Sequence, residues 1–150
     1  MSQSQSVEDL KRRFRDFSET ASKFSREVFP SPTDLAELTR TAEANLTIAK
    51  TIFGKWSLEI LVLLYSMKKL GFEQIRRTLR PISRRILSQK LKSLEANGMV
   101  RRNVVSSRPL RVEYTLTEKG LVVAKLGEPV FLYLRLDPGR ELSPLREKVT

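Results

Sequence analysis

The fold is decided by residues 71–98, GFEQIRRTLRPISRRILSQKLKSLEANG, which have the pattern of two short helices joined by a tight turn. Pro81 ends the first helix, because a proline ring cannot continue the helical hydrogen-bond ladder. Ser83 is placed to cap the second helix, since its hydroxyl can accept an unpaired backbone N–H of the first turn. Gly98 stands where that helix should end and tolerates the left-handed conformation found there. The stretch therefore predicts a helix-turn-helix.

The second helix of this stretch has an apolar face and a polar face. Its leucines at 87, 91 and 94 are spaced for burial in a core. Arginine and glutamine can pair with guanine and adenine edges in a DNA major groove, and a short serine lets a helix approach closely. The pattern is typical of a recognition helix, although an ordinary amphipathic helix with a solvated charged face has the same appearance. The polar side chains are Arg84, Arg85, Ser88, Gln89 and Lys92.

The excess positive charge is confined to the segment around this pattern. The 150-residue chain has 28 Lys and Arg against 17 Asp and Glu, a net charge of +11. Residues 68–111 hold thirteen basic and two acidic side chains, which accounts for the whole excess. A solvated surface would scatter its charges, so this concentration points to a polyanion. We expect the partner to be double-stranded DNA.

Two absences in the composition narrow the possible functions. The chain has no cysteine and no histidine, so it lacks a thiol nucleophile, a thiolate metal site and the commonest general base. We therefore expect no enzyme, no catalytic residues, no metal and no cofactor. No apolar run approaches the roughly 18 residues of a membrane span, and the polar start has no signal-peptide pattern. We expect a cytoplasmic protein that associates with the nucleoid when bound to DNA.

After Gly98 the periodicity changes from helical to two. Apolar and polar residues alternate over 110–116, the preceding strand is expected over 99–105, and residues 106–109 supply the turn. A hairpin directly behind a recognition helix is a wing, in which Arg108 can enter a minor groove or grip a phosphate. The alternative is a hairpin that only covers the core, with its arginines solvated.

The N-terminal segment has a heptad seam that must be buried by something. Its apolar residues alternate at spacings of three and four over three repeats, within a helix expected at residues 6–28. The seam either packs on the globular domain or pairs with a partner chain. It consists of Val7, Leu10, Phe14, Phe17, Ala21, Phe24 and Val28.

The rest of the chain carries four further expectations. A second helix should follow a cap at Ser31, with Pro32 as its first residue. The apolar run from Trp56 to about residue 67 should be the central buried helix, with Lys55 at its start within reach of a phosphate. Another helix, capped by Thr117, should end near residue 126 and be interrupted at 127–129. The apolar residues 130–134 have the character of an oligomer surface, and the tail from residue 137 is expected to be loose.

With these residues laid out, the segment from about 44 to 126 resembles the HxlR family of winged helix-turn-helix transcription regulators. Gly54-Lys55-Trp56 looks like that family's GGKW helix start, and residues 72–77 with Ile82-Ser83 look like its Phe-x-Glu-Leu-Arg and Gly-Ile-Ser turn. Residues 112–117, VEYTLT, resemble the ending of its wing. The order and spacing of these motifs carry the resemblance.

The resemblance implies a homodimer that places two recognition helices in successive major grooves, with terminal helices forming the dimer interface. A small-molecule effector stays unknown, because no residue pattern marks a pocket. Together with the charge pattern, the residues expected at DNA are Lys55, Ser83, Arg84, Arg85, Ser88, Gln89, Lys92, Arg102, Arg108 and Arg111. Those expected at the dimer interface are Leu10, Phe14, Phe17, Phe24, Phe131 and Leu134.

The sequence also departs from the family pattern. Phe53 stands where the family usually has its first glycine, Pro81 replaces the glycine of Gly-Ile-Ser, and Gln74 replaces the usual glutamate. The Cys-Pro that some members use for redox sensing is missing, which excludes a thiol switch here. The roughly forty N-terminal residues exceed the family layout, so their role cannot be borrowed from it.

The predicted fold class is mainly α with a small β-hairpin (α+β), a winged helix-turn-helix with extra N- and C-terminal helices. We expect a helical arm for dimerisation at 1–30, the DNA-binding domain at 31–127, and an apolar segment with a loose tail at 128–150. The expected function is a sequence-specific transcriptional regulator acting as a homodimer. Two alternatives stay open, a non-specific architectural or RNA-binding winged helix and a protein-interaction winged helix.

Overall fold

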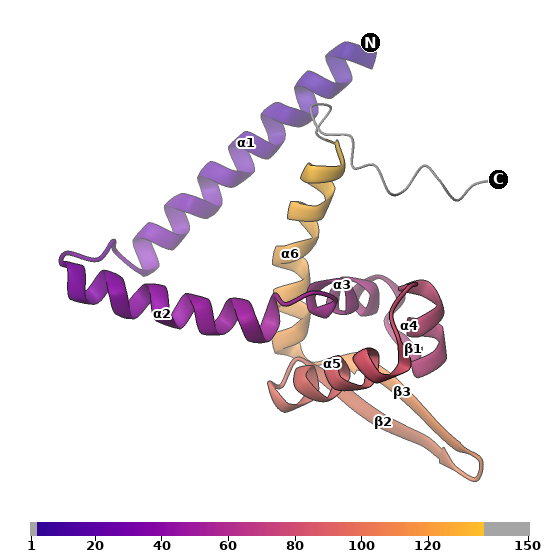
Figure 1. The fold of residues 1–150 in the computed structure, drawn as a ribbon. Helices are drawn as coiled ribbons and strands as arrows, with labels where there is room; N and C mark the ends of the chain where they lie inside the picture. Colours follow the sequence, from indigo (N-terminus) through magenta and orange to yellow (C-terminus); the bar gives the residue numbers. More distant parts are fainter. Residues whose placement is uncertain (1–2, 137–150) are drawn as a thin grey trace. The chain divides into compact units, whose positions relative to one another are not determined.

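The computed structural model describes residues 3–136, and the side chains of residues 5–136 (Figure 1). The tail expected from residue 137 lies outside the described residues. The chain forms two compact units that meet within one helix, between Ala44 and Asn45. The elements in chain order are α1 (Gln3–Val28), α2 (Leu35–Ile52), α3 (Ser57–Met67), β1 (Lys69–Gly71), α4 (Phe72–Thr78), α5 (Arg84–Ala96), β2 (Val100–Ser107), β3 (Leu110–Leu116) and α6 (Glu118–Leu136). The prediction of a mainly α chain with a small β-hairpin is confirmed, and a short third strand joins the hairpin.

The second unit is built around the apolar face of α3, as the sequence predicts. Ile60, Leu61 and Leu64 are at most 1% exposed, and α6 packs against the same helix. Trp56 is half-buried against this core rather than exposed to a ligand. Helices α4, α5 and α6, the sheet and the segments that join them complete the core with Leu70, Ile75, Ile82, Leu87, Leu91, Leu94, Met99, Val100, Tyr114 and Ala124.

The helix-turn-helix forms as predicted, with the predicted end signals. The Ser83 hydroxyl accepts a hydrogen bond from the Ile86 backbone N–H at 3.2 Å, which caps α5. Gly98 follows α5 with a φ of 71°, the left-handed conformation that a side chain would disfavour. At the start of α4, the Gln74 side chain accepts the backbone N–H of Gly71 at 2.8 Å. Gln74 therefore closes the first turn of α4 in place of the glutamate usual in the family pattern.

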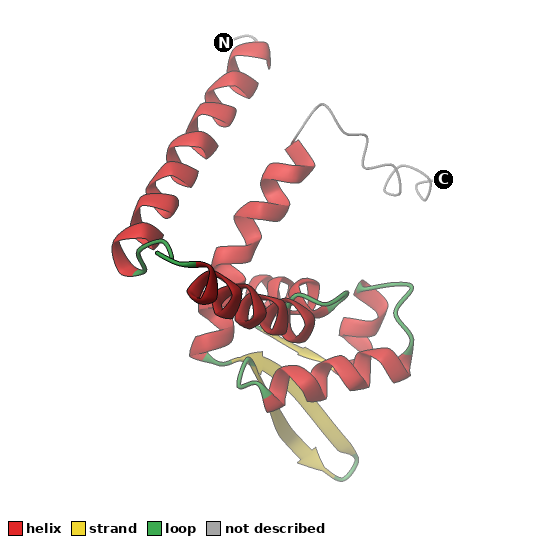
Figure 2. Cartoon of the chain, turned by 60° about the vertical axis from the view of Figure 1, so that its left-hand side comes forward, coloured by secondary structure: helices red, strands yellow, loops and turns green. Residues whose placement is uncertain are grey.

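The hairpin is part of a three-stranded antiparallel sheet of order β1-β3-β2, whose strands are yellow in Figure 2. Strand β1 was not predicted, because three residues are too few to show a two-residue period; Leu70 pairs with Tyr114 of β3. The predicted alternation over 110–116 does not bury every apolar residue: Leu110 is 67% exposed because it lies at the hairpin tip, beyond the core. The turn is also tighter than predicted, at Arg108-Pro109 only.

Thr117 joins three elements at the base of the sheet. Its hydroxyl donates to the Gly98 carbonyl at 2.5 Å and accepts the Gly120 backbone N–H at 3.0 Å, so it caps α6 as predicted. Its own backbone N–H donates to the Met99 carbonyl at 3.0 Å. The Lys119 ammonium adds a bond to the carbonyl of Asn97 at 3.1 Å. The end of α5, the start of β2 and the start of α6 therefore share one hydrogen-bonded junction.

Two predicted helix boundaries are wrong. Helix α2 begins at Leu35, and its cap is Asp34, whose carboxylate accepts the Glu37 backbone N–H at 2.8 Å. Asp34 replaces the predicted cap Ser31 because a carboxylate at the positive end of a helix is the stronger acceptor. Helix α6 does not stop at residue 126 but runs through Pro129 to Leu136.

Packing explains why α6 continues through residues 127–129. Gly127 is buried against α3, and a Cβ there would lie 2.7 Å from the Leu58 side chain. Helix α6 packs against α3, and the close approach of Gly127 to Leu58 holds the helix together where Pro129 removes a backbone hydrogen bond. The apolar residues 130–134 therefore belong to the same helix as residues 118–126.

Helix α1, taken by itself, carries the predicted heptad seam, and most of that seam is exposed. Val7, Phe17, Phe24 and Val28 are 43%, 53%, 64% and 60% exposed. Helix α2 likewise contributes no buried residue. Within residues 3–136 no helix combines the length and the apolar character that crossing a membrane requires.

Candidate nucleic-acid interface

The two faces of α5 separate as the sequence predicts. Leu87, Leu91 and Leu94 are at most 2% exposed, which fixes the rotation of the helix. The opposite face then turns to solvent, where the side chains of Arg84, Arg85, Gln89 and Lys92 are exposed and Ser88 is half-buried. This exposed face presents three cations, an amide and a hydroxyl in consecutive turns, a surface that can hydrogen-bond with base edges and phosphates.

The N-terminus of α5 is electrostatically suited to an anion. Its first turn contains no acidic residue, and Arg84 and Arg85 add two positive charges to the positive end of the helix dipole. The Ser83 hydroxyl accepts its hydrogen bond from the Ile86 N–H, so its own proton can be donated outward. A phosphate placed here would meet one hydroxyl donor and two guanidinium groups.

Glu73 is a contributor to this surface that the sequence did not single out. One of its carboxylate oxygens lies 2.6 Å from the Arg84 guanidinium, and the other accepts a hydrogen bond from Arg76 Nε at 3.0 Å. The pair with Arg84 links α4 to α5 across the turn. The signal in the sequence was that Glu73 is one of only two acidic residues in the basic segment 68–111. A predicted DNA-contacting arginine is thus held by a carboxylate.

The wing lies beside α5 in both views, and α5 contacts β2 (Figures 1 and 2). The predicted residues Arg102, Arg108 and Arg111 are all exposed, as is Arg101. Between these arginines the hairpin also exposes three apolar side chains. These are Val104, Val105 and Leu110, exposed by 55%, 54% and 67%, next to an irregularity in the strand register at 104–106.

Lys55 lies at the start of α3, near α5. Its ammonium is 5.2 Å from the centroid of the Trp56 ring, a cation–π contact. A Cβ on Gly54 would lie 3.2 Å from the ammonium nitrogen of Lys90 in α5, so this loop adjoins the recognition helix. Lys55, before α3, and Lys90, in α5, therefore place two positive charges in the same part of the surface. Lys90 is, after Glu73, the second residue of this surface that was not predicted.

The residues predicted at a dimer interface lie on two helices. On α1, Phe17 and Phe24 are exposed while Leu10 and Phe14 are half-buried. On α6, Leu134 is 44% exposed and Phe131 is half-buried. Phe131 lines a hollow between α3 and α6 whose lining is partly apolar and partly charged. The other lining residues are Glu59, Val62, Leu63, Ser66, Leu79, Glu128 and Arg135.

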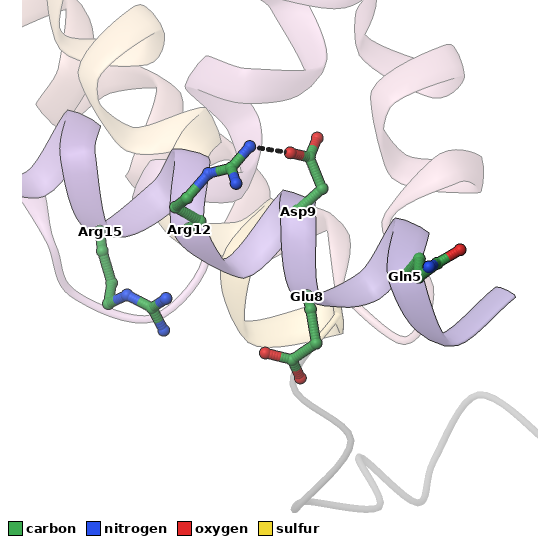
Figure 3. Close-up of a pocket in the computed structure, with 5 residues that line it drawn as sticks. All are labelled: Gln5, Glu8, Asp9, Arg12 and Arg15. Atoms are coloured by element: carbon green, nitrogen blue, oxygen red, sulfur yellow. Dashed lines mark hydrogen bonds and ion pairs between the residues drawn. The ribbon is translucent and has the colours of Figure 1, made fainter. Parts of the chain in front are cut away.

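A second hollow lies on the polar side of α1 (Figure 3). Arg12 pairs with Asp9 there, and Glu8 pairs with Lys11 at 3.3 Å. Gln5 and Arg15 complete its lining. All the lining residues come from one helix and point in different directions in Figure 3, so the hollow has the character of a solvated helix face.

The sequence of the chain is similar to those of known transcriptional regulators. A family model described as HxlR-like helix-turn-helix matches residues 51–131, just over half of the chain. The uncharacterized HTH-type transcriptional regulator YdzF of Bacillus subtilis (strain 168) is 38% identical over 69 residues, 46% of this chain and 63% of that protein. YvaP of the same organism, with the same description, is 47% identical over 58 residues, 38% of this chain and 54% of that protein. The chain thus matches less than two thirds of each relative's length.

Solved structures give the same similarity. A transcriptional regulator of the MarR family from Enterococcus faecalis V583 matches with a TM-score of 0.55 and 26% identity, covering 71% of this chain and 89% of that one. The reduced form of the transcriptional regulator YodB from B. subtilis matches with a TM-score of 0.52 and 26% identity, covering 65% of this chain and 96% of that one. The proteins with a similar fold are therefore transcriptional regulators.

Proposed function

The chain belongs to the HxlR-like helix-turn-helix family, and from that premise we propose that it regulates transcription by binding double-stranded DNA sequence-specifically as a homodimer. Helix α5 enters a major groove with its exposed face, and the β2–β3 wing contacts the adjacent minor groove or backbone. The observation that carries the proposal is the division of α5. Its leucine face is fully buried, so its cationic and amide side chains can only face outward.

The side chains have distinct roles in this proposal. Arg85, Ser88 and Gln89 lie on the part of α5 that reads base edges, since arginine and glutamine pair best with guanine and adenine. Polar and charged side chains on the wing, in the loops and elsewhere on α5 bind the DNA backbone, which gives affinity without sequence information. The residues in this second group are Lys55, Ser83, Arg84, Lys92, Arg102, Arg108 and Arg111.

Dimerisation would let two copies read two half-sites. Two-fold-related recognition helices reach successive major grooves when the half-sites are about 34–36 Å apart, one turn of DNA. We propose that residues 1–30 form the dimerisation arm, 31–127 the DNA-binding domain and 128–150 an apolar segment with a tail. The exposed apolar side chains of α1, and those of α6 beyond residue 129, support this division, because exposed apolar patches favour association.

A selection experiment tests the proposal directly. A random duplex pool of about 30 bp is bound at about 50 and at about 200 mM salt, and the bound fraction is sequenced. A motif with two-fold symmetry that survives the higher salt is the expected result. Release of every sequence together, without enrichment, would identify a general nucleic-acid binder of the architectural or RNA-binding kind instead.

Arg85→Ala and Arg102→Ala should weaken DNA binding in different ways. Loss of Arg85 should relax the preference at one base pair by about 1–3 kcal/mol, because it removes a bidentate contact to a base edge. Loss of Arg102 should weaken all duplexes alike, because a phosphate contact carries no sequence information. The measurement is fluorescence anisotropy on the selected motif and on its single-base variants. Equal losses from both substitutions on every sequence would refute the assigned roles.

Glu73→Gln should strengthen binding to every duplex. The substitution removes the carboxylate that lies 2.6 Å from the Arg84 guanidinium, so the charge of Arg84 is no longer offset when it binds a phosphate. The slope of log affinity against log salt should steepen by about one unit, because one more net positive charge then faces the DNA backbone. Glu95→Gln is the matched control, because it removes the same charge from an exposed position near the other end of α5. The role of Glu73 is wrong if both variants change the slope equally.

A further inference from the structure

Helix α1 is long, regular and amphipathic, and its own unit leaves much of its apolar seam exposed. The helix has 26 residues, so it extends about 39 Å at 1.5 Å per residue. Phe17, Phe24 and Val28 on the seam are more than half exposed. A seam that repeats every 3.5 residues is best buried by another helix of equal length with the same repeat. A second copy of α1 meets both conditions.

We propose that α1 pairs with α1 of a second copy of the chain, and that the two helices run antiparallel. The inference rests on the homodimer proposed above and adds its orientation, its register and the charges that fix them. In the proposed register the residue numbers of each facing seam pair sum to 38. Phe17 then faces Ala21 of the partner subunit, Phe14 faces Phe24 of the partner subunit, and Leu10 faces Val28 of the partner subunit.

Side-chain size favours this arrangement over a parallel pair in register. A parallel pair would place Ala21 opposite Ala21 of the partner subunit, between two layers of facing phenylalanines. Two alanine side chains would not fill the space between helices that the adjacent phenylalanine layers hold apart. The void left there would lower the stability of the dimer. The antiparallel pair places the largest and smallest seam residues opposite each other at its centre, so the layers fill evenly. Phe14 and Phe24 of the partner subunit can then stack as an aromatic pair.

Charge complementarity selects the same arrangement. Arg13 and Glu27 occupy equivalent positions beside the seam, where side chains of paired helices meet and set their orientation. In the antiparallel register Arg13 meets Glu27 of the partner subunit, and the two-fold axis repeats the pair. In a parallel pair Arg13 would meet Ser18 of the partner subunit. Shifting the antiparallel register by one heptad would place Arg13 beside Thr20 of the partner subunit, so only one register pairs opposite charges.

Neighbouring charges on α1 have partners within the helix, which distinguishes them from this pair. Lys11 lies 3.3 Å from Glu8, and Arg12 pairs with Asp9. Arg13 and Glu27 are fourteen residues apart, about 21 Å along the helix, so they cannot pair within one chain. An interaction between them therefore reports contact between chains.

A charge exchange in the full chain tests the register. Arg13→Glu and Glu27→Arg should each raise the dimer dissociation constant about three- to tenfold, because each turns two attractions into repulsions. The double variant Arg13→Glu/Glu27→Arg should return the constant to within about threefold of the original, since the pairs are re-formed with exchanged signs. Sedimentation equilibrium gives the constants, and circular dichroism checks that each variant keeps its helices. Glu19→Arg, on the outer face of the proposed pair, is the matched control and should change nothing.

A distance measurement tests the orientation independently of any energy. Because the chain has no cysteine, Glu19→Cys and Gln5→Cys each take a single spin label, and both positions face away from the seam partner. In the antiparallel pair the two residue-19 labels lie at the same height on opposite sides of the pair, whereas the residue-5 labels are also separated by about 42 Å along the axis. Pulsed electron paramagnetic resonance should therefore give a much longer distance for residue 5.

The possible outcomes separate this inference from the proposed function. Equal label distances at residues 5 and 19 in a dimer, or a double variant as weak as the single ones, would overturn antiparallel pairing and leave dimerisation through α6 intact. A chain that sediments as a monomer at micromolar concentration, with no label distance, would overturn the homodimer itself and this pairing with it.

Discussion

DNA binding by the chain should weaken by about 10³- to 10⁵-fold when the salt concentration rises from about 50 to about 200 mM, the fall expected for six to ten phosphate contacts. The physical reason is the release of counterions from DNA as basic side chains neutralise phosphates. The thirteen basic residues of segment 68–111 supply more than enough cations for that number of contacts. Fluorescence anisotropy with one duplex over a salt series gives the slope directly.

Two single substitutions calibrate this slope. Arg102→Ala should reduce it by about one unit, because one phosphate contact is lost. Lys125→Ala is the control: the side chain is exposed on α6, outside the basic segment, and its removal should leave the slope unchanged. An affinity that stays constant across the salt series would show that the basic segment does not meet a phosphate backbone.

Gly120→Ala should destabilise the second unit by about 3 kcal/mol or more, a large effect for adding one methyl group. Helix propensity alone would favour alanine by about 1 kcal/mol, so the sign is decided by space. A Cβ on Gly120 would lie 1.9 Å from the carbonyl oxygen of Met99, and a backbone atom cannot move aside without displacing the strand that follows it. Urea unfolding of the full chain measures the loss, and the wing should lose its docking on α6 at the same time.

Gly127→Ala provides the matched comparison on the same helix. Its Cβ would lie 2.7 Å from the end of the Leu58 side chain, which can rotate away, while alanine gains helix propensity. We expect a change within about 1 kcal/mol of zero for this variant. The interpretation of Gly120 would be wrong if both substitutions cost the same free energy of unfolding, since backbone and side-chain neighbours would then be equivalent.

Much of the fold could be predicted because local rules and burial agree over most of the second unit. The leucines of α5 and the apolar run of α3 have the period that their burial requires, and Ser83 and Gly98 mark the ends of α5. The error at the end of α6 arose where a local rule was opposed by packing. Pro129 predicts a helix end, but α6 packs against α3 and approaches it closely at Gly127, and the helix continues to Leu136.

The sequence predicted which residues of α5 form the candidate site, but it did not predict which other side chains contact them. The exposed residues of α5 follow from the helical period once Leu87 and Leu91 are placed inside. The carboxylate of Glu73 near Arg84 could not be predicted, because the distance between α4 and α5 depends on how the turn places the two helices. The exposed tip of the wing was missed for a related reason. A two-residue period describes which way side chains point, but it does not say where the core underneath the strand ends.

The junction around Thr117 has a mechanical consequence. The Thr117 hydroxyl donates to the Gly98 carbonyl, just after α5, and accepts a backbone N–H from the first turn of α6. The Thr117 backbone N–H donates to the Met99 carbonyl, just before β2. A rotation of α6 about its N-terminal end would therefore move the base of the wing and the end of α5 together. A molecule that binds the C-terminal half of α6 would therefore set the angle between α5 and the wing. That angle determines the width of the DNA groove that α5 and the wing can contact together.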